Sequence, residues 1–166
     1  MRGVTLRTQS TRRAEALAQA QEQILINRPV EQVWGFHSDP TNIPRISVNT
    51  TRYEPKGPMA LGCRIIGATK VIGKTVEWEA DVVEYAPQRG YRLRSVVAPL
   101  QWELAYSYRP IQGKTMVIAE QTAFGLSGFF GRISEKFIVM RYRRDLSKNL
   151  ANLKQMVEDL PAPGGQ

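Results

Sequence analysis

The segment INRPVEQVWGFHSDPTNIPRI, residues 26–46, interrupts an extended pattern twice within a short distance. It opens like the end of a strand, which Pro29 then breaks. Residues 30–38 have the spacing of a short helix, with Val, Trp and Phe side chains on its apolar side. Asp39 can cap a second helical turn or two over residues 40–46, because proline suits the first position of a helix. The segment therefore predicts one strand followed by two short helices.

Six further segments with the character of strands follow these helices. They span residues 47–54, 62–71, 75–85, 91–97, 100–109 and 115–124. Turns that contain glycine or proline separate them, so short connections and an antiparallel meander are expected. Two stretches, residues 76–82 and 100–109, alternate apolar with polar side chains. This alternation predicts a sheet with one buried face and one face toward solvent.

The C-terminal part of the chain has the pattern of one long helix. Residues 127–160 carry apolar side chains at spacings of three and four, and a shifted apolar set in the first half includes Phe137. Residues 1–20 are rich in arginine and threonine, then in alanine and glutamine, which indicates a flexible or partly helical extension. Residues 161–166 are expected to be a disordered tail. One domain is therefore predicted over residues 21–160.

The order of these elements predicts an α+β fold. A curved, seven-stranded antiparallel sheet has one apolar face, and only the long C-terminal helix is left to cover it. The two short helices after the first strand would close one end. A single helix, about 10 Å across, cannot fill the space within a curved sheet of this width. An internal hydrophobic cavity is therefore expected.

The composition excludes several classes of site. The chain has 166 residues, of which 42% are hydrophobic and 23% are charged, as in an ordinary single-domain protein. One cysteine and one histidine are too few for an internal disulfide or a protein-only transition-metal site, so no metal is expected. Glycine-rich phosphate loops are absent, and no cofactor is predicted. With neither a long apolar run nor a secretory signal, the protein is expected to be soluble and cytoplasmic.

The net charge of +8 raises the question of an anionic partner. Four arginines precede the first acidic residue, so half of the excess charge belongs to the N-terminal extension. A second basic group, in residues 132–148, is interleaved with acidic residues, as on a solvated helix face. No helix-turn-helix, zinc-finger or ribonucleoprotein motif accompanies these charges, so no specific nucleic-acid partner is expected. A weak contact with an anionic membrane stays open.

Three separated motifs resemble the START-like helix-grip superfamily, which includes the polyketide cyclase/dehydrase and lipid-transport group and the pollen-allergen-like proteins. They are the opening segment, VVEYAPQRGYRLR at residues 82–94 and LKQMVE at residues 153–158. The resemblance covers about residues 22–159 and implies the helix-grip fold with a cavity for a hydrophobic ligand. At Arg45 and its neighbours this chain has Pro-Arg-Ile where the family often has a tryptophan, which implies a differently shaped cavity mouth. The motifs are structural and fix no activity.

The predicted inner face is unusually aromatic and supplies most candidate ligand contacts. The candidate ligand-binding residues are Trp78, Trp102, Tyr106, Tyr108, Tyr53, Arg45, Phe124 and Phe137. An aromatic wall suits a flat or hydrophobic ligand, and tyrosine hydroxyls can orient it. The alternative is that these rings only fill the core. Arg45 and Tyr53 would border the entrance.

Glu120 and Tyr106 are the candidate catalytic residues. A five-residue loop directly after Tyr108 would pair Tyr106 with Met116. Glu120 would then face inward together with Phe124, and burial would raise its pKa and suit it to general acid or base chemistry. A four-residue loop reverses the register, so that Gln121 faces inward and Glu120 is exposed.

His37 ends the first short helix. At the cavity mouth it could gate or transfer protons. The favoured interpretation is a surface histidine at a helix end. One histidine without a recognisable partner does not indicate a catalytic triad.

Three functions follow from these observations. The first is a binding or carrier protein for a hydrophobic small molecule, such as a lipid, a polyketide or another polycyclic or acyl compound. The second is an enzyme of the polyketide aromatase/cyclase type that uses the same cavity without a metal or nucleotide. The third is a peripheral membrane lipid carrier that places Arg141, Arg143 and Arg144 against anionic headgroups. The chain is expected to be a monomer or a homodimer.

Overall fold

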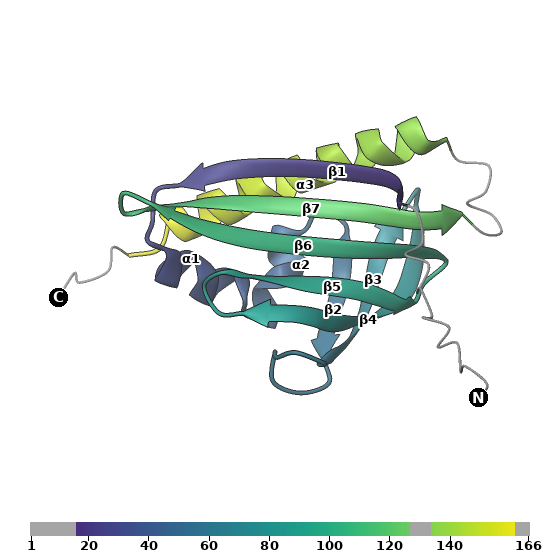
Figure 1. Cartoon of the computed structure of the whole chain (residues 1–166), viewed down its shortest axis with the longest axis horizontal. Helices are drawn as coiled ribbons and strands as arrows, with labels where there is room; N and C mark the ends of the chain where they lie inside the picture. The colour runs from purple at the N-terminus through teal and green to yellow at the C-terminus, as the bar shows by residue number, and fades with distance from the viewer. Residues whose placement is uncertain (1–15, 127–133, 162–166) are drawn as a thin grey trace, which may run out of the picture.

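The computed structural model describes residues 16–126 and 134–161 (Figure 1). The helical elements are α1 (Val30–His37), the 3₁₀ turn η1 (Pro40–Asn42), α2 (Ile43–Ile46) and α3 (Glu135–Glu158). The strands are β1 (Ala16–Ile26), β2 (Thr50–Pro55), β3 (Arg64–Val71), β4 (Lys74–Ala86), β5 (Gly90–Val97), β6 (Leu100–Ile111) and β7 (Lys114–Leu126). The predicted α+β helix-grip architecture is confirmed.

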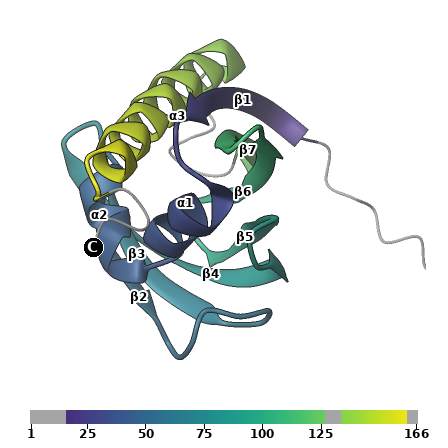
Figure 2. The same ribbon diagram turned by 90° about the vertical axis from the view of Figure 1, so that its left-hand side faces the viewer.

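The seven strands form one antiparallel sheet in the order β1-β7-β6-β5-β4-β3-β2. Strands β2 to β7 follow the predicted meander, and β1 adds to the far edge by pairing with β7. The sheet curves strongly, and α3 lies along the side formed by β1 and β7 (Figures 1 and 2). Seen from its end, the curve of the sheet also encloses α1 (Figure 2). Helices α3 and α1 therefore both lie on the concave side of the sheet.

Strand β1 begins at Ala16, five residues before the predicted start of the domain. The Ala- and Gln-rich stretch was expected to be flexible or helical, but pairing with β7 makes it extended. Ala18 and Ala20 are each 3% exposed, and Ala18 packs against Ile138 of α3. The small alanine side chains suit this close approach, and tertiary pairing overrides their helical preference. Residues 1–15 and 162–166 lie outside the described residues.

Proline separates the elements where the sequence predicts it. Pro29 lies between β1 and α1, and Pro40 begins η1 after the end of α1. In η1, Asp39 caps the turn, since its Oδ1 accepts hydrogen bonds from the backbone N of Thr41 at 2.9 Å and from the Thr41 hydroxyl at 2.7 Å. Asn42 then ties η1 to α1 by donating from Nδ2 to the carbonyl of Phe36 at 3.0 Å. The hydrogen bonds from Thr41 lower the pKa of Asp39. The two short helices are thereby held together.

Helix α3 begins at Glu135 and is capped by Ser134, whose hydroxyl accepts a hydrogen bond from the backbone N of Phe137 at 3.3 Å. The first seven residues of the predicted helix, 127–133, lie outside the described residues. The buried side of α3 carries Ile138, Leu146, Leu150, Leu153 and Val157. Each such side chain contributes about 1.5–3 kcal/mol when it leaves water. The apolar stripe predicted from the sequence therefore anchors α3 across the sheet.

Candidate functional site

A cavity of about 230 Å³ lies between the inner face of the sheet and α3. Residues from α1, α2, several strands and α3 line it, together with the β5–β6 turn. Its wall includes His37, Ile43, Ile46, Tyr53, Val76, Trp78, Tyr91, Leu93, Leu104, Tyr106, Gln121, Ile138, Tyr142 and Leu146. Most of these side chains are apolar or aromatic. The expected internal hydrophobic cavity is present.

The cavity has an exposed end and a buried end. Among its lining residues, Ile72 is 61% exposed and Phe137 is 40% exposed, so the mouth lies between the β3–β4 turn and the start of α3. At the other end the lining consists of buried residues, with His37 2%, Tyr91 5% and Tyr106 7% exposed. A ligand that enters at the mouth therefore meets these rings last.

Charge is confined to the mouth. Apart from His37, the titratable cations and anions in the lining are Lys70, Arg141 and Asp145. Arg141 Nε lies 3.6 Å from Asp145 Oδ2, and Asn49 donates from Nδ2 to the same carboxyl oxygen at 2.7 Å. Burial raises the pKa of Asp145, while the nearby cations oppose that effect. The mouth thus carries the charged side chains of the cavity lining, and the interior carries none.

Trp78 and Trp102 form the aromatic wall that the sequence predicts. Their ring centroids lie 5.2 Å apart at 87°, and Tyr53 contacts Trp78 at 6.2 Å. Trp78 donates from its indole N to the hydroxyl of Thr69 at 2.9 Å, which fixes the ring's orientation. All three rings line the cavity. The structure therefore places these candidate residues together.

Tyr106 and Tyr108 have different positions although both are buried. Tyr106 lines the cavity, and its ring meets that of His37 at 4.5 Å and 85°. Tyr108 is absent from the lining and packs its ring against Trp34 at 5.3 Å. Burial raises the pKa of Tyr106 to about 12 and raises that of Tyr108 well above its usual value. Both phenols are therefore neutral at physiological pH.

His37 is buried, which corrects the interpretation of a surface histidine at a helix end. It is 2% exposed, and its Nδ1 lies 2.6 Å from the hydroxyl of Tyr108. Burial lowers the pKa of His37 to about 3, so the imidazole is neutral at physiological pH. The sequence carried a signal for this position. Val30, Val33, Trp34 and His37 are the buried residues of α1, and their spacing of three, four and seven is that of one helix face.

Glu120 does not face the cavity, and the five-residue loop is wrong. Ile111 pairs with Lys114 across a two-residue turn, which sets Tyr106 opposite Ala119 and Ala105 opposite Glu120. A two-residue turn has the same parity as the four-residue alternative, so Gln121 faces inward and lines the cavity. The turn residues Gln112 and Gly113 both have positive φ, as this type of tight hairpin requires.

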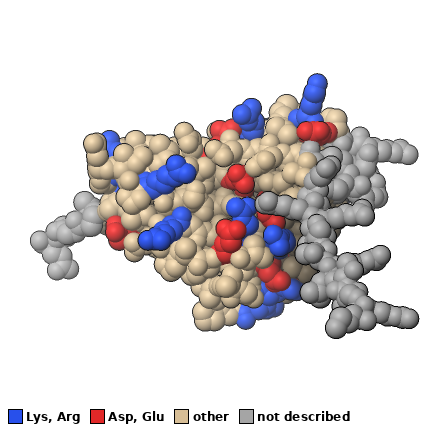
Figure 3. All heavy atoms as spheres, viewed as in Figure 1, with Lys and Arg blue, Asp and Glu red and all other residues tan. Residues whose placement is uncertain are grey.

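Glu120 lies instead on the outer face of the sheet. Its carboxylate is 3.8 Å from Arg92, within a ladder of ion pairs in which Arg92 also contacts Glu84 and Glu103. Charges of both signs are mixed over this face (Figure 3), which does not resemble a nucleic-acid surface. A second, more polar hollow of about 390 Å³ borders Glu120 there. The apolar inner cavity is the better ligand site.

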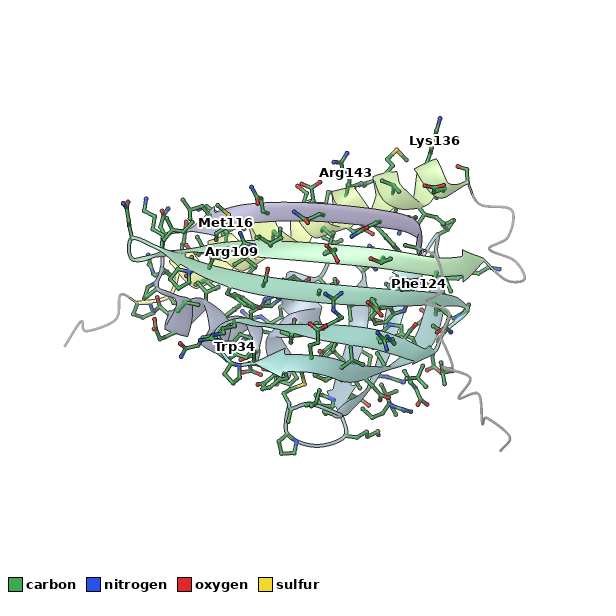
Figure 4. The ribbon with its side chains drawn as sticks, in the orientation of Figure 1. Trp34, Arg109, Met116, Phe124, Lys136 and Arg143 are labelled. Carbon is green, nitrogen blue, oxygen red and sulfur yellow. The ribbon has the colours of Figure 1, made fainter. Side chains whose placement is uncertain are left out.

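Three remaining candidates also divide by position. Phe124 has the same parity as Glu120, so it lies opposite Gln101 rather than in the cavity wall, and it is half-buried near the end of β7 (Figure 4). Arg45 is exposed, donates to Asn42 Oδ1 at 3.0 Å and does not line the cavity. Phe137 lines the mouth. The inward placement expected for Phe124 is therefore wrong.

No group of three or more His, Cys, Asp or Glu side chains that could hold a metal ion occurs within residues 16–126 and 134–161. Within the same residues, no helix is both long enough and apolar enough to cross a membrane.

Known proteins share this sequence pattern and this architecture. A family model described as polyketide cyclase/dehydrase and lipid transport matches residues 18–158. Among curated protein sequences none matches. Similar solved structures are known from several bacteria.

A START superfamily protein from Mycobacterium smegmatis superposes with a TM-score of 0.73 at 11% identity, over 86% of this chain and 99% of that one. A protein from Thermus thermophilus gives a TM-score of 0.73 at 18% identity, over 84% and 96%. The Zhui aromatase/cyclase from a Streptomyces species gives 0.70 at 15% identity, over 89% and 98%. At such identities these likenesses concern the fold.

Proposed function

Because this chain belongs to the polyketide cyclase/dehydrase and lipid transport family, we propose that it binds a hydrophobic small molecule in the cavity between the sheet and α3, as a carrier or binding protein. The observation that carries the proposal is the cavity itself. It is apolar and aromatic inside, and its charged lining residues stand only at the mouth. This is the arrangement of a small-molecule site with few orienting polar groups.

The size of the cavity narrows the class of ligand. Its volume of about 230 Å³ is below the roughly 300–1,000 Å³ of most ligand pockets. A compact molecule of two or three fused rings, or an acyl chain of medium length, fits better than a large lipid. The T-shaped pair of Trp78 and Trp102 offers ring edges and faces to a flat ligand.

The placement of the candidate catalytic groups favours binding over catalysis. Glu120 lies on the outer face and Arg45 lies outside the cavity lining, so of the polar groups expected to assist a cyclase only Tyr106 remains in the wall. A phenol whose pKa is raised to about 12 does not act as a base at neutral pH.

An aromatase/cyclase-type enzyme is the second candidate function. The observation that favours it is His37, a neutral imidazole in the wall beside Tyr106. Such a group can polarise a carbonyl and so assist enolisation. The solved aromatase/cyclase of the same fold is consistent with this chemistry but is too distant in sequence to assign it.

Adjacent residues on β6 offer a matched test of the carrier proposal. Leu104 lines the cavity, whereas Ala105 points to the other face of the sheet. In Leu104→Trp the larger ring occupies the cavity, so affinity for the fluorescent probe 1-aminoanthracene should fall at least tenfold. Ala105→Trp should keep the affinity of the unchanged protein. Equal binding by both variants, or no probe binding by the unchanged protein, contradicts a ligand in this cavity.

A membrane-docked carrier is the remaining alternative, and the rim of the mouth favours it. Ile72, Phe137 and Met140 are exposed apolar side chains, and Lys136 projects from α3 away from the sheet (Figure 4). Arg143 is directed instead at β1, where its Nε lies 3.5 Å from Glu22 Oε1. Apolar side chains beside cations suit an anionic lipid surface. Sedimentation with phosphatidylserine vesicles at low salt tests it. Failure of the protein to sediment removes this alternative and leaves the cavity proposal intact.

A further inference from the structure

The buried end of the cavity holds an unusual hydrogen bond for an apolar site. His37 comes from α1 and Tyr108 from β6, and the distance from the His37 Nδ1 to the Tyr108 hydroxyl is 2.6 Å. Both residues are nearly inaccessible, at 2% and 4% exposure. His37 lines the cavity and Tyr108 stands behind it. Nδ1 of His37 is thus hydrogen-bonded within the protein, whereas Nε2 has no hydrogen-bond partner among the described residues.

Which of the two groups donates in this hydrogen bond follows from the absence of any other acceptor for the Tyr108 hydroxyl in the described part of the chain. Within residues 16–126 and 134–161, the hydroxyl of Tyr108 has no hydrogen-bond partner other than His37. If Nδ1 carried the proton and donated to Tyr108, the phenol's own O–H would be buried without an acceptor. Leaving a buried donor unpaired costs about 1–3 kcal/mol. The phenol therefore donates to Nδ1.

A neutral imidazole that accepts at Nδ1 carries its proton at Nε2. The depressed pKa of His37 agrees with a neutral ring. In the described residues no acceptor is bonded to Nε2. The N–H at Nε2 is then the polar group that His37 can offer to a ligand, beside the hydroxyl of Tyr106, whose ring meets His37 at 4.5 Å.

We propose that Tyr108 fixes His37 as the Nε2–H tautomer, and that this N–H binds a carbonyl oxygen of an apolar ketone at the buried end of the cavity. Tyr108 is in this scheme a positioning residue, and His37 is a ligand-binding residue. The inference rests on the proposed function, because it requires that the cavity hold a ligand. It adds which chemical group the ligand carries and which end of it enters first.

The same geometry argues against a carboxylate at this end. The charged lining residues are Lys70, Arg141 and Asp145, and they belong to the mouth. A buried carboxylate without a cation carries a large desolvation penalty, which a single neutral N–H does not offset. A ketone needs only one donor and is neutral. The ligand is therefore expected to point its ketone inward and any charged group toward the mouth.

The tautomer can be read directly, because the chain contains a single histidine. In protein labelled with nitrogen-15 histidine, the two ring nitrogens give one pair of signals in a long-range proton–nitrogen spectrum. At neutral pH the Nε2 signal should have the shift of a protonated nitrogen and the Nδ1 signal that of a hydrogen-bonded acceptor. Tyr108→Phe should produce a mixture of tautomers. Tyr85→Phe removes a half-buried phenol that is not bonded to His37 and should change nothing.

Recognition of the ketone is tested with two ligands of nearly equal shape. The probes are 2-acetylnaphthalene and 2-isopropenylnaphthalene, which differ by a carbonyl oxygen in place of a methylene group. Their Kd values are measured by displacement of 1-aminoanthracene. Relative to the unchanged protein, His37→Phe should shift the ratio of the two Kd values about tenfold toward the alkene, the effect of one lost hydrogen bond. Tyr108→Phe should shift it severalfold and Tyr85→Phe not at all.

Each outcome decides something different. An Nδ1–H tautomer or an imidazolium at neutral pH overturns the proposed hydrogen bond. An unchanged Kd ratio in both His37→Phe and Tyr108→Phe, with both probes bound, overturns ketone recognition and leaves the carrier proposal standing. Binding of neither probe to the unchanged protein overturns the carrier proposal, and ketone recognition with it. Circular dichroism of each variant checks that the fold is kept, and Tyr108→Phe suffices if His37→Phe fails to fold.

Discussion

The indole of Trp78 lies directly over Gly67 on the neighbouring strand, where the two residues pair in register. A β-carbon added at position 67 would overlap the ring atoms Cζ2 and Cη2 of Trp78. Because Gly67 has no side chain, the ring of Trp78 can pack against its backbone and take its place in the cavity wall. Its role comes from close approach of a side chain and not from an unusual backbone angle.

Gly67→Ala is therefore expected to push Trp78 into the cavity. Overpacking of this kind costs about 1–3 kcal/mol of the free energy of unfolding. Binding of 1-aminoanthracene should weaken together with stability, and tryptophan fluorescence should shift. Gly35→Ala is the control, since nothing lies within 4 Å of its added carbon. Gly35 is inside α1, so alanine there should stabilise by about 0.5–1 kcal/mol. A neutral effect at position 67 would contradict the packing described.

Glu120→Gln should change neither ligand affinity nor stability appreciably. The carboxylate is on the outer face, 3.8 Å from Arg92, with 31% of its side chain exposed. Exposed ion pairs at such distances contribute about 0–1 kcal/mol. Titration with 1-aminoanthracene and denaturation with urea measure the two quantities. A loss of affinity would mean that the register between β6 and β7 is different from the one described. Leu104→Trp, from the opposite face of β6, gives the positive comparison.

Stability should fall as the pH is lowered from about 6.5 toward 3, because of His37. In the folded protein its pKa is about 3, against 6.5 in the unfolded chain. Between these values the unfolded state binds one more proton, so protonation favours unfolding. The slope is at most about 1.4 kcal/mol per pH unit for one group.

The measurement is the free energy of unfolding in urea at pH 7, 6 and 5, above the range where most carboxyl groups titrate. His37→Phe serves as the reference, because subtracting its pH dependence removes that of other groups, including Asp145, whose pKa is raised. Parallel pH profiles for the two proteins would show that His37 has the same pKa in the folded and unfolded states, and would contradict its burial as a neutral ring.

Asp39→Ala should lower the free energy of unfolding by about 1 kcal/mol, the usual effect of removing a helix N-cap. The variant loses both hydrogen bonds to Thr41 and with them the start of η1. Asp39→Ser keeps an acceptor oxygen and should recover most of the loss. Thermal unfolding of the three proteins gives the comparison. If the serine and alanine variants are equally destabilised, the capping bond is not the cause.

The sequence predicts the elements better than the contacts between them. Strands β4 and β6 are recognisable by alternation, and α3 by its apolar stripe, since these signals are local. The register of β6 against β7 depends on whether the turn has an odd or an even number of residues. Strand propensity at Ile111 and Lys114 does not fix that number, so the prediction from sequence puts Glu120 on the wrong face. For the same reason Phe124 was expected inside.

The burial of His37 could have been predicted from the sequence. Val30, Val33, Trp34 and His37 lie on one face of α1, and the polar character of histidine outweighed that periodicity. Its hydrogen bond to Tyr108 could not, because the two residues are 71 positions apart and meet only through the fold. Likewise, the strand character of Ala18 depends on its neighbour in the sheet, β7, which lies far away in the sequence.

The pairing of β1 with β7 also decides the order in which the molecule can be built. During synthesis β1 leaves the ribosome before the other described strands, and its partner β7 is the last of these strands to follow. Contacts this far apart in sequence close slowly. The meander from β2 to β6 can form by successive hairpins, and during this time β1 has no strand to pair with. Until β7 has been made, the exposed backbone of β1 is open to pairing with other chains.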